Sequence, residues 1–228
     1  MRNHSTTQMS DSFLVGIPVI LSAGYMDVYT YLLRDGVFAN AQTGNIILLA
    51  VRLTERQWQA ALHYALPIVA FTAGILVSLI VRWKCKKLTA VHWRQVCLLM
   101  QAVILVMAVF PGKPENILSS CMVSLACGIQ LQSFRTLHGY SLATTMCIGN
   151  LRTATEQLFV FCVTKQRKTL HSCAVYAGVI GLFALGAVLG NVGVMLWGYS
   201  ALLFCPALLL FACAVMCRAP KCDACIEN

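Results

Sequence analysis

The carboxylate of Asp27 is the side chain best placed to do chemistry in this sequence. It lies about fourteen residues into the apolar run 13–33, near the depth where the middle of a bilayer would fall. A charge at that depth costs from about 2.5 to more than 10 kcal/mol, so such residues usually face a bundle interior or a wet cavity. We interpret Asp27 as a group that couples to a proton or a cation. The alternative is a structural Asp, held by a helix partner or by a neighbouring hydroxyl such as Tyr31 or Thr30.

A polar break follows in the segment 37–51. It contains Asn40, Gln42 and the run Thr43-Gly44-Asn45, and Gly36 precedes it. These residue types allow a helix to end and restart, and a helix N-terminus inside a membrane attracts an anion and leaves backbone groups free for a substrate. We therefore expect a substrate or ion site whose residues in this half are Asp27, Asn40, Thr43, Gly44 and Asn45. The alternative is an extracellular turn before a partly buried helix.

A second polar set lies at and beyond the end of the apolar run 117–137 and would supply the other half of the site. Its members are Gln130, Thr144, Thr145, Gly149 and Asn150. Arg152 and Glu156 lie in the same region, but they are four residues apart, which favours a simple ion pair along one helix face.

The composition predicts a membrane protein. The 228 residues are 59% hydrophobic and 11% charged, with a mean hydropathy of +0.74, whereas about a quarter of the residues in a soluble domain are charged. The formal net charge of +9 does not indicate nucleic acid, because the basic residues cluster in short segments between apolar runs. We expect an all-α, polytopic helix bundle whose main partner is the lipid bilayer.

Six apolar runs predict six transmembrane helices in one membrane domain, 13–217. Five of them are long enough to cross and one is shorter; they are 13–33, 60–81, 117–137, 172–197 and 200–217, and the shorter 95–110. The domain divides into halves at about 13–110 and 117–217. A polar N-terminal tail, 1–12, and a cysteine-containing C-terminal tail, 218–228, flank it.

The distribution of Lys and Arg distinguishes two topologies. If the ambiguous segments 37–51 and 140–163 both re-enter, twelve of the 17 basic residues share the face of the two termini and four lie opposite, while Arg135 falls inside a predicted span. If both segments cross, the resulting eight spans lose most of this bias. The positive-inside rule favours six spans in a multi-pass protein of the cell membrane (inner membrane), with both termini cytoplasmic.

Two glycine patterns suggest an internal repeat. The first is Gly24, Gly36 and Thr43-Gly44-Asn45, and the second is Gly128, Gly139 and Ile148-Gly149-Asn150; their spacings are twelve and eight residues against eleven and ten. Because each half would hold three crossing helices, the halves would insert with opposite orientations. Inverted halves that each carry a broken or re-entrant segment are typical of a transporter site at the membrane midplane. The alternative is a chance match in an apolar chain.

The same two stretches resemble a known family. AGYMDVYTYLLRDGVFANAQTGNIILL is similar to the opening motif of the YoaK family of small membrane proteins, and ACGIQLQSFRTLHGYSLATTMCIGNL resembles its second motif, Gly-x-Gln followed by Ala-Thr-Thr and a Gly. The resemblance covers about 16–217 and implies a multi-spanning membrane protein without an established activity. The chain departs from the second motif at Ile148, where a Thr is expected.

Glycines and cysteines give two further expectations. The helix 172–197 carries glycines that suit close helix packing, within the chain or in a homo-oligomer. These are Gly178, Gly181, Gly186, Gly190 and Gly193. The pair Cys222 and Cys225 has metal or redox spacing, but a single CxxC lacks the second ligand pair of a zinc site. We expect incidental thiols there, with no metal and no cofactor.

The resulting hypothesis is a secondary transporter or channel for a small solute, with Asp27 coupled to a proton or cation and the breaks at Thr43-Gly44-Asn45 and Gly149-Asn150 meeting near mid-membrane. The sequence contains no Walker-type loop, HExxH, Gly-x-Ser-x-Gly or dinucleotide fingerprint, so we expect neither an ATP-driven pump nor an enzyme. The alternative is a non-transporting membrane scaffold or accessory subunit, in which the Gly-rich helix mediates assembly and Asp27 is structural.

Overall fold

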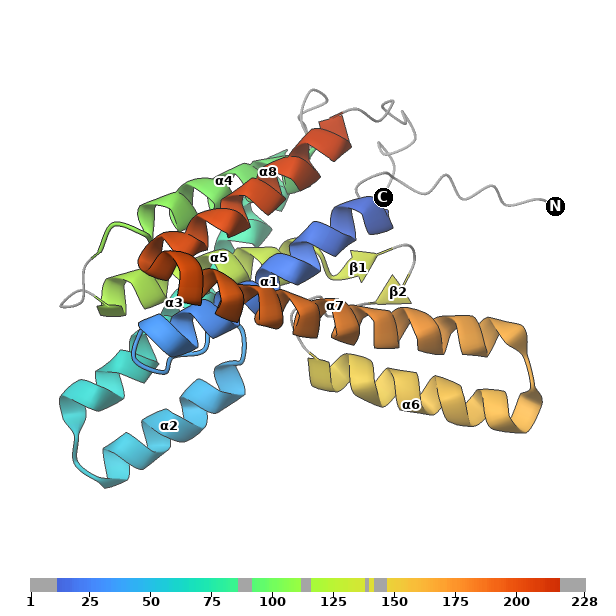
Figure 1. Cartoon of the computed structure of the whole chain (residues 1–228), viewed down its shortest axis with the longest axis horizontal. Helices are drawn as coiled ribbons and strands as arrows, with labels where there is room; N and C mark the ends of the chain where they lie inside the picture. Colours follow the sequence, from blue (N-terminus) through green and yellow to red (C-terminus); the bar gives the residue numbers. More distant parts are fainter. Residues whose placement is uncertain (1–11, 86–91, 112–115, 138–139, 142–146, 218–228) are drawn as a thin grey trace.

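The computed structural model describes residues 12–85, 92–111, 116–137, 140–141 and 147–217. These residues form helices and one short hairpin (Figure 1). In chain order the elements are α1 (Phe13–Leu33), α2 (Gln42–Thr54), α3 (Trp58–Cys85), α4 (Trp93–Met107), α5 (Asn116–Ser133), β1 (Thr136–Leu137), β2 (Tyr140–Ser141), α6 (Cys147–Thr164), α7 (Arg167–Trp197), the 3-10 helix η3 (Gly198–Leu203) and α8 (Phe204–Cys217). Apart from the antiparallel pair β1 and β2, the described part is helical, which confirms the predicted fold class.

Three helical stretches are long and apolar enough to cross a membrane. They are Phe13–Leu33, Trp58–Cys85 and the continuous run Arg167–Cys217, and the shorter Trp93–Met107 is also apolar. One predicted boundary was wrong. The run 117–137 was expected to be one span that includes Arg135, but α5 ends at Ser133 and Arg135 is exposed beyond it. The long apolar helices indicate a membrane protein.

The run Arg167–Cys217 reverses direction at η3, where Gly198 has a left-handed backbone (φ +54°). Contacts with α1 show the reversal. Gly186 of α7 packs on Leu21 and Gly190 on Tyr25, so α7 runs parallel to α1. Beyond η3, Phe204 lies 5.3 Å from Tyr25 between ring centroids and the Cys205 thiol donates to the Ser22 carbonyl, so α8 runs antiparallel to α1.

Side-chain contacts show which helix ends lie together at each of the two ends of the bundle. At one end, Gln95 at the start of α4 donates to Cys217 at the end of α8 (3.2 Å). At the other end, Arg34 directly after α1 donates to Asn116 at the start of α5 (3.0 Å). Further along, Gln130 of α5 donates to the Val19 carbonyl (2.7 Å), so α5 runs antiparallel to α1.

The two halves of the chain use glycine in the same way at their main helix contacts. A Cβ on Gly24 of α1 would collide with the Phe183 carbonyl of α7, and a Cβ on Gly128 of α5 would collide with the Phe71 carbonyl of α3. At these points the helix backbones touch directly, as small residues allow in membrane bundles.

The Gly-rich helix α7 therefore packs within the chain, as predicted, at part of its length. Gly186 faces Leu21, and Gly190 and Gly193 face Tyr25. By contrast, a Cβ on Gly178 or Gly181 would meet nothing within 4 Å.

The end of α1 turns the chain back along the helix. Asp35 (φ +57°) and Gly36 (φ +75°) both adopt left-handed backbones, and the Gly36 N–H donates to the Tyr31 carbonyl (3.2 Å). This geometry is a common helix ending. The following loop reaches the middle of α1 again, because the Asn40 amide donates to the Ala23 carbonyl (3.1 Å). From there α2 begins.

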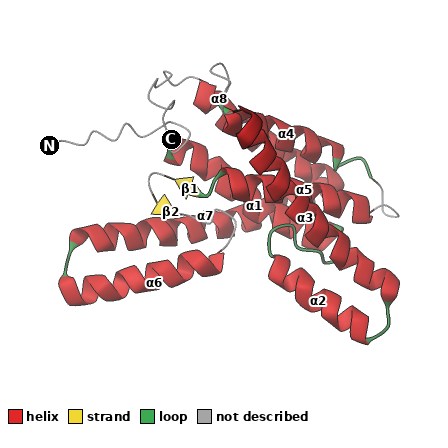
Figure 2. Ribbon diagram, turned by 180° about the vertical axis from the view of Figure 1, so that it is seen from behind, coloured by secondary structure: helices red, strands yellow, loops and turns green. Residues whose placement is uncertain are grey.

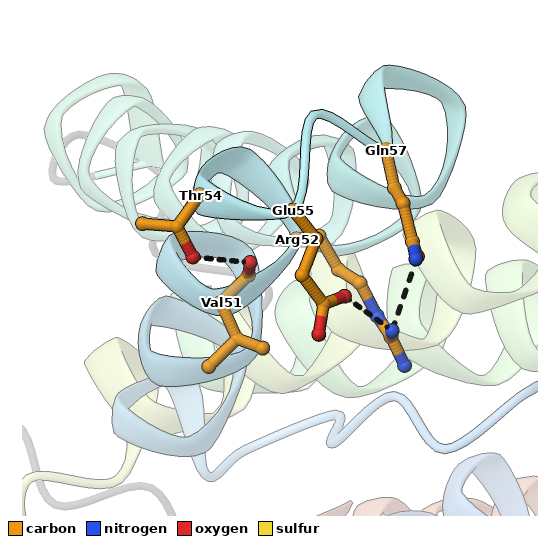
Figure 3. Close-up of polar contacts among 5 residues, drawn as sticks. All are labelled: Val51, Arg52, Thr54, Glu55 and Gln57. Carbon is orange, nitrogen blue, oxygen red and sulfur yellow. Dashed lines mark hydrogen bonds and ion pairs between the residues drawn. The ribbon is translucent and has the colours of Figure 1, made fainter.

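A short turn joins α2 to α3 (Figure 3). Arg52 forms an ion pair with Glu55 (2.8 Å) and also donates to Gln57 (3.1 Å), while the Thr54 hydroxyl donates to the Val51 carbonyl (2.7 Å). These hydrogen bonds pair the polar side chains with one another and with the Val51 carbonyl at an exposed turn.

Two helix pairs project from the bundle, α2 with the start of α3 and α6 with the start of α7 (Figures 1 and 2). On α6, Arg152 pairs with Glu156 at 2.9 Å, and both side chains are exposed. The prediction of a simple ion pair on one helix face is confirmed.

Candidate functional site

Asp27 is buried in the middle of α1, with 8% of its surface exposed. One carboxylate oxygen accepts the backbone N–H of Asn40 at 2.7 Å. A charged acceptor makes such bonds roughly twice as strong as neutral ones. The carboxylate thus holds the loop that leads into α2.

Neither hydroxyl expected as a structural partner binds this carboxylate. Thr30 donates to main-chain carbonyls of its own helix, those of Met26 and Asp27, at 3.0 and 3.2 Å. The Tyr31 ring stacks on Phe38, with 5.1 Å between centroids. The partner of Asp27 is instead the backbone ahead of α2, thirteen residues along the chain. That alternative was wrong in its choice of partner.

Asn40 and Asn45 keep the loop in place. Asn40 is 6% exposed and its amide donates to Ala23, while its own carbonyl oxygen Oδ1 has no partner among the described residues. Asn45 is fully buried, and its side chain forms two hydrogen bonds with the Phe38 backbone: it accepts the Phe38 N–H (3.0 Å) and donates to the Phe38 carbonyl (2.7 Å). A third bond joins Asn45 to Gln42 (2.9 Å). Hydrogen bonds within the loop and to α1 therefore fix the loop beside that helix.

The Asp27 carboxylate lies just ahead of the N-terminus of α2, because it accepts the N–H of Asn40, two residues before the first helical residue, Gln42. A helix N-terminus carries a partial positive charge, which favours a carboxylate nearby. An anionic substrate group at this position stays a prediction.

The second half of the predicted site is only partly described. Gln130 is fully buried and ties α5 to α1, since its amide donates to Val19 (2.7 Å) and its oxygen accepts from Ser22 (3.5 Å). Asn150 is buried on α6 at 3% exposure. Thr144 and Thr145 lie outside the described residues.

Two predicted residues are exposed or at the margin of the site. Thr43 and Gly149 both lie on the surface, and a Cβ on Gly149 would meet nothing within 4 Å. Gly44 lies closer in, because a Cβ there would approach the Phe38 ring at 2.9 Å.

The sequence reasoning missed Arg34, which was counted as a basic residue of the less positive face. Its side chain is fully buried. The guanidinium donates to the Pro111 carbonyl (2.9 Å), the Asn116 side chain (3.0 Å) and the Tyr29 hydroxyl (2.9 Å), and it lies 4.6 Å from the Tyr199 ring centroid. No carboxylate is among these partners, all of which lie in the described part of the chain.

Arg34 is therefore a buried cation held by carbonyls, an amide and aromatic rings. It joins the end of α1 to the end of α4, the start of α5 and η3. Arg34 directly precedes Asp35 and Gly36, whose left-handed backbones end α1. No spacing in the sequence identifies partners some 80 residues away.

The described part of the chain holds no group of three His, Cys, Asp or Glu side chains arranged for a metal ion. What the site offers is a buried carboxylate, a loop whose backbone depends on it, and an unpaired amide oxygen at Asn40.

Fold and site together define a class: an α-helical, membrane-type protein whose first long helix carries a buried carboxylate bonded to a broken segment. Over residues 15–216 the chain matches the family described as protein of unknown function (DUF1275), and it belongs to that family. It has no significant match among curated proteins or among solved structures.

Proposed function

We propose that this protein crosses the cell membrane six times, with both termini in the cytoplasm and with α2 and α6 as re-entrant helices. The helix directions support six crossings over eight. If α2 crossed the bilayer fully, α5 would run parallel to α1; the pairs Gln130 with Val19 and Asn116 with Arg34 make it antiparallel. This topology also suits the resemblance to YoaK-family proteins.

The length of α2 supports re-entry as well. Its thirteen residues extend roughly 20 Å, whereas the hydrocarbon core is about 30 Å thick. Its start lies beside Asp27 in the middle of α1, and its end lies at the exposed turn with Arg52 and Glu55. A helix that starts at mid-depth and ends at the surface has no need to cross.

The positions of the glycines support two inverted halves. Gly24 relates α1 to α7 as Gly128 relates α5 to α3, and α1 and α5 are antiparallel. An axis in the membrane plane that exchanges α1 with α5 and α3 with α7 accounts for both contacts.

We further propose that the protein is a secondary transporter or channel for a small solute, with a proton or cation acting at Asp27. The observation that carries this proposal is the bond from the Asn40 N–H to the buried Asp27 carboxylate. A proton or cation that neutralises the carboxylate weakens its hold on the loop, since hydrogen bonds to charged groups contribute about 1.5–3 kcal/mol and neutral ones about 0.5–1.5. Ion arrival at Asp27 is thereby coupled to movement of the loop and α2.

The test is a thermal-stability screen of the purified protein against small solutes and cations at two pH values, followed by flux assays in proteoliposomes. Asp27→Asn keeps the shape and an acceptor oxygen but removes the charge. Glu156→Gln removes a carboxylate from the exposed ion pair on α6 and is the matched control. A ligand present at a hundred times its dissociation constant should add about 2.7 kcal/mol to the free energy of unfolding.

Stabilisation and flux in the wild type and in Glu156→Gln, with both lost in folded Asp27→Asn, are the expected results. Normal ligand-dependent flux in Asp27→Asn would remove the coupling role.

The second candidate is a non-transporting scaffold or accessory subunit, and the bond from the Asn40 N–H to Asp27 favours it, because a carboxylate that anchors a loop needs no ligand. The surface around Gly178 and Gly181 has space for a second helix and would mediate assembly, including a homo-oligomer. Co-purification with a fixed partner, no response to any solute, and an Asp27→Asn variant that is merely less stable would support this candidate.

A further inference from the structure

Asp35 and His63 lie side by side at the base of the segment that carries α2. Asp35 follows the end of α1 and His63 lies in the second turn of α3, so residues 36–62 separate the two in sequence. The distance between the Asp35 Oδ2 and the His63 Nε2 is 3.7 Å. This Nε2 atom is buried and has no hydrogen-bond partner among the described residues. The two ends of the segment therefore meet through a carboxylate and an imidazole that are close but not hydrogen bonded.

The Asp35 carboxylate is held from its other side by the bundle. Its Oδ2 accepts the side-chain amide of Asn116 at the start of α5 (2.9 Å), and Asn116 in turn accepts from the buried Arg34 (3.0 Å). His63 is 13% exposed, whereas Asp35 is 60% exposed. A charge on His63 has little access to water, so a neighbouring carboxylate is the group that can stabilise it. The contact with His63 adds α3 to a polar network that already joins α1 to α5.

The protonation state of His63 decides whether this contact becomes a bond. Histidine is the side chain whose charge ordinarily changes between about pH 5 and 8. A protonated imidazole donates from both ring nitrogens, and its bond to a carboxylate is about 2.7–2.9 Å long and roughly twice as strong as a neutral hydrogen bond. Reaching that length from 3.7 Å takes a movement of only about 1 Å.

The charged groups on the helix beside α3 have other partners or no printed bond to His63. Those on α2 and its turn into α3 are Arg52, Glu55 and Arg56. Arg52 and Glu55 pair with each other at 2.8 Å. In the described part of the chain, Asp35 is the carboxylate within ion-pair distance of His63.

The remaining neighbours of His63 come from three elements. On its own helix, the Tyr64 ring lies edge-on at 5.7 Å between centroids. At the end of α1, Arg34 opposes a positive charge on His63, but Asn116 lies between them in the chain of bonds. Before α5, Lys113 and Glu115 lie outside the described residues.

We propose that Asp35 and His63 form a proton-dependent ion pair that holds the segment carrying α2 against the bundle. When His63 is charged, the pair joins the start of α3 to the end of α1 and so fixes both ends of residues 36–62. When His63 is neutral, this tie is lost. The stability that the pair contributes is therefore present at low pH and is lost as the pH rises.

Asp27 holds the same segment at a different point, through the Asn40 N–H. Neutralising Asp27 weakens that hold, whereas protonating His63 strengthens the hold at the base. In the proposed six-span topology the base lies at the outer end of the bundle, so acid outside the cytoplasm keeps α2 in place. Only this assignment of side rests on the proposed function. The ion pair is measured in detergent, so its failure is distinguishable from failure of the topology or of transport.

The experiment is a double-mutant cycle on the full-length protein in one detergent at pH 5.5 and at pH 8.0. Its members are the wild type, His63→Gln, Asp35→Asn and the double variant. Asn tolerates the left-handed backbone at position 35 and keeps an acceptor oxygen for Asn116. Other titrating groups, such as His92 at the start of α4, are common to all four proteins and cancel.

Two matched cycles replace Asp35→Asn by another loss of a carboxylate. Glu55→Gln lies in the same segment, and its carboxylate pairs with Arg52. Glu115→Gln lies directly before Asn116 in the sequence. Each protein is followed by its thermal midpoint, and the wild type and His63→Gln are also compared by hydrogen exchange of the α2 amides. The exchange comparison does not need Asp35→Asn to fold.

We expect His63 and Asp35 to be coupled by about 1–4 °C in the midpoint at pH 5.5 and not at pH 8.0. The α2 amides should exchange about twofold to fivefold more slowly in the wild type than in His63→Gln at pH 5.5, and at equal rates at pH 8.0. Equal exchange at pH 5.5, or the same coupling at both pH values, overturns the proposal. Coupling of His63 to Glu55 or Glu115 as large as that to Asp35 also overturns it, because the partner would then be misidentified.

Discussion

The contact of α1 with α7 gives the sharpest quantitative prediction, through the substitution Gly24→Ala. The new Cβ would collide with the backbone carbonyl of Phe183 and lie 3.0 Å from the Ala187 nitrogen. Backbone atoms cannot rotate away, so the two helices must separate, at a cost of about 1–3 kcal/mol by analogy with overpacked cores. The matched control is Gly178→Ala on α7, where a Cβ meets nothing and the gain in helix propensity is up to about 1 kcal/mol.

The two variants should therefore differ by about 1–4 kcal/mol in the free energy of unfolding. For a chain of this size 1 kcal/mol corresponds to roughly 2–4 °C, so the midpoints should differ by about 2–16 °C. The assay is thermal unfolding in one detergent, followed by a thiol-reactive dye that reports exposure of the buried Cys127 and Cys205. A Gly24→Ala protein that melts with Gly178→Ala or above it would refute the direct backbone contact.

The same reasoning applies to the other half of the chain. Gly128→Ala places a Cβ against the Phe71 carbonyl, so its loss of stability should equal that of Gly24→Ala. Loss in one half alone would argue against two equivalent contacts.

Three further predictions follow from buried polar groups. Arg34→Met should lower the free energy of unfolding by about 2–5 kcal/mol, because it leaves the buried acceptors of Arg34 without a donor. Arg34→Lys should lower it by an intermediate amount in the same thermal assay. Asn45→Ala removes three hydrogen bonds and should raise protease cleavage between residues 35 and 45 without changing overall helicity. Burial lowers the pKa of His92 in the folded state, so the stability that its neutral form contributes is present above pH 6.5 and is lost as the pH falls towards the folded pKa. The midpoint of thermal unfolding should therefore drop between about pH 7.5 and 5.5. The drop should be smaller in His92→Asn.

The length of the apolar runs was enough to predict most of the helices. The apolar runs at 13–33 and 172–197 lie within α1 and α7, because membrane-length apolar stretches have few other structures open to them. Both ambiguous segments contain helices, α2 and α6, which their polar residues made hard to assign. The helix end at Ser133 was missed because the apolar residues Phe134 and Leu137 lie beyond it, on either side of Arg135 and Thr136.

The sequence did not reveal how the candidate site residues connect. Asp27 and Asn40 meet through the backbone N–H of Asn40, which no side-chain pattern indicates, while Asn45 is bonded to Phe38 and Gln42 in the same loop. That these residues bind a ligand stays a prediction. Arg34 was misjudged for a related reason. Its partners at Pro111 and Asn116 come from other helices, and only the packed fold brings them together.

The pairing of α1 with α7 also has a consequence for biosynthesis. Phe183 is made about 160 residues after Gly24, which at roughly 5–20 residues per second is about 8–30 s later. The acceptors of Arg34 around Asn116 follow it by about 80 residues, or roughly 4–16 s. During that interval the first helix resides in the membrane with its glycine face and its cation unsatisfied. Emergence of α7 then covers the glycine face of α1, and α8 completes the bundle; a ribosome that stalls earlier leaves a chain suited to capture by quality-control proteases.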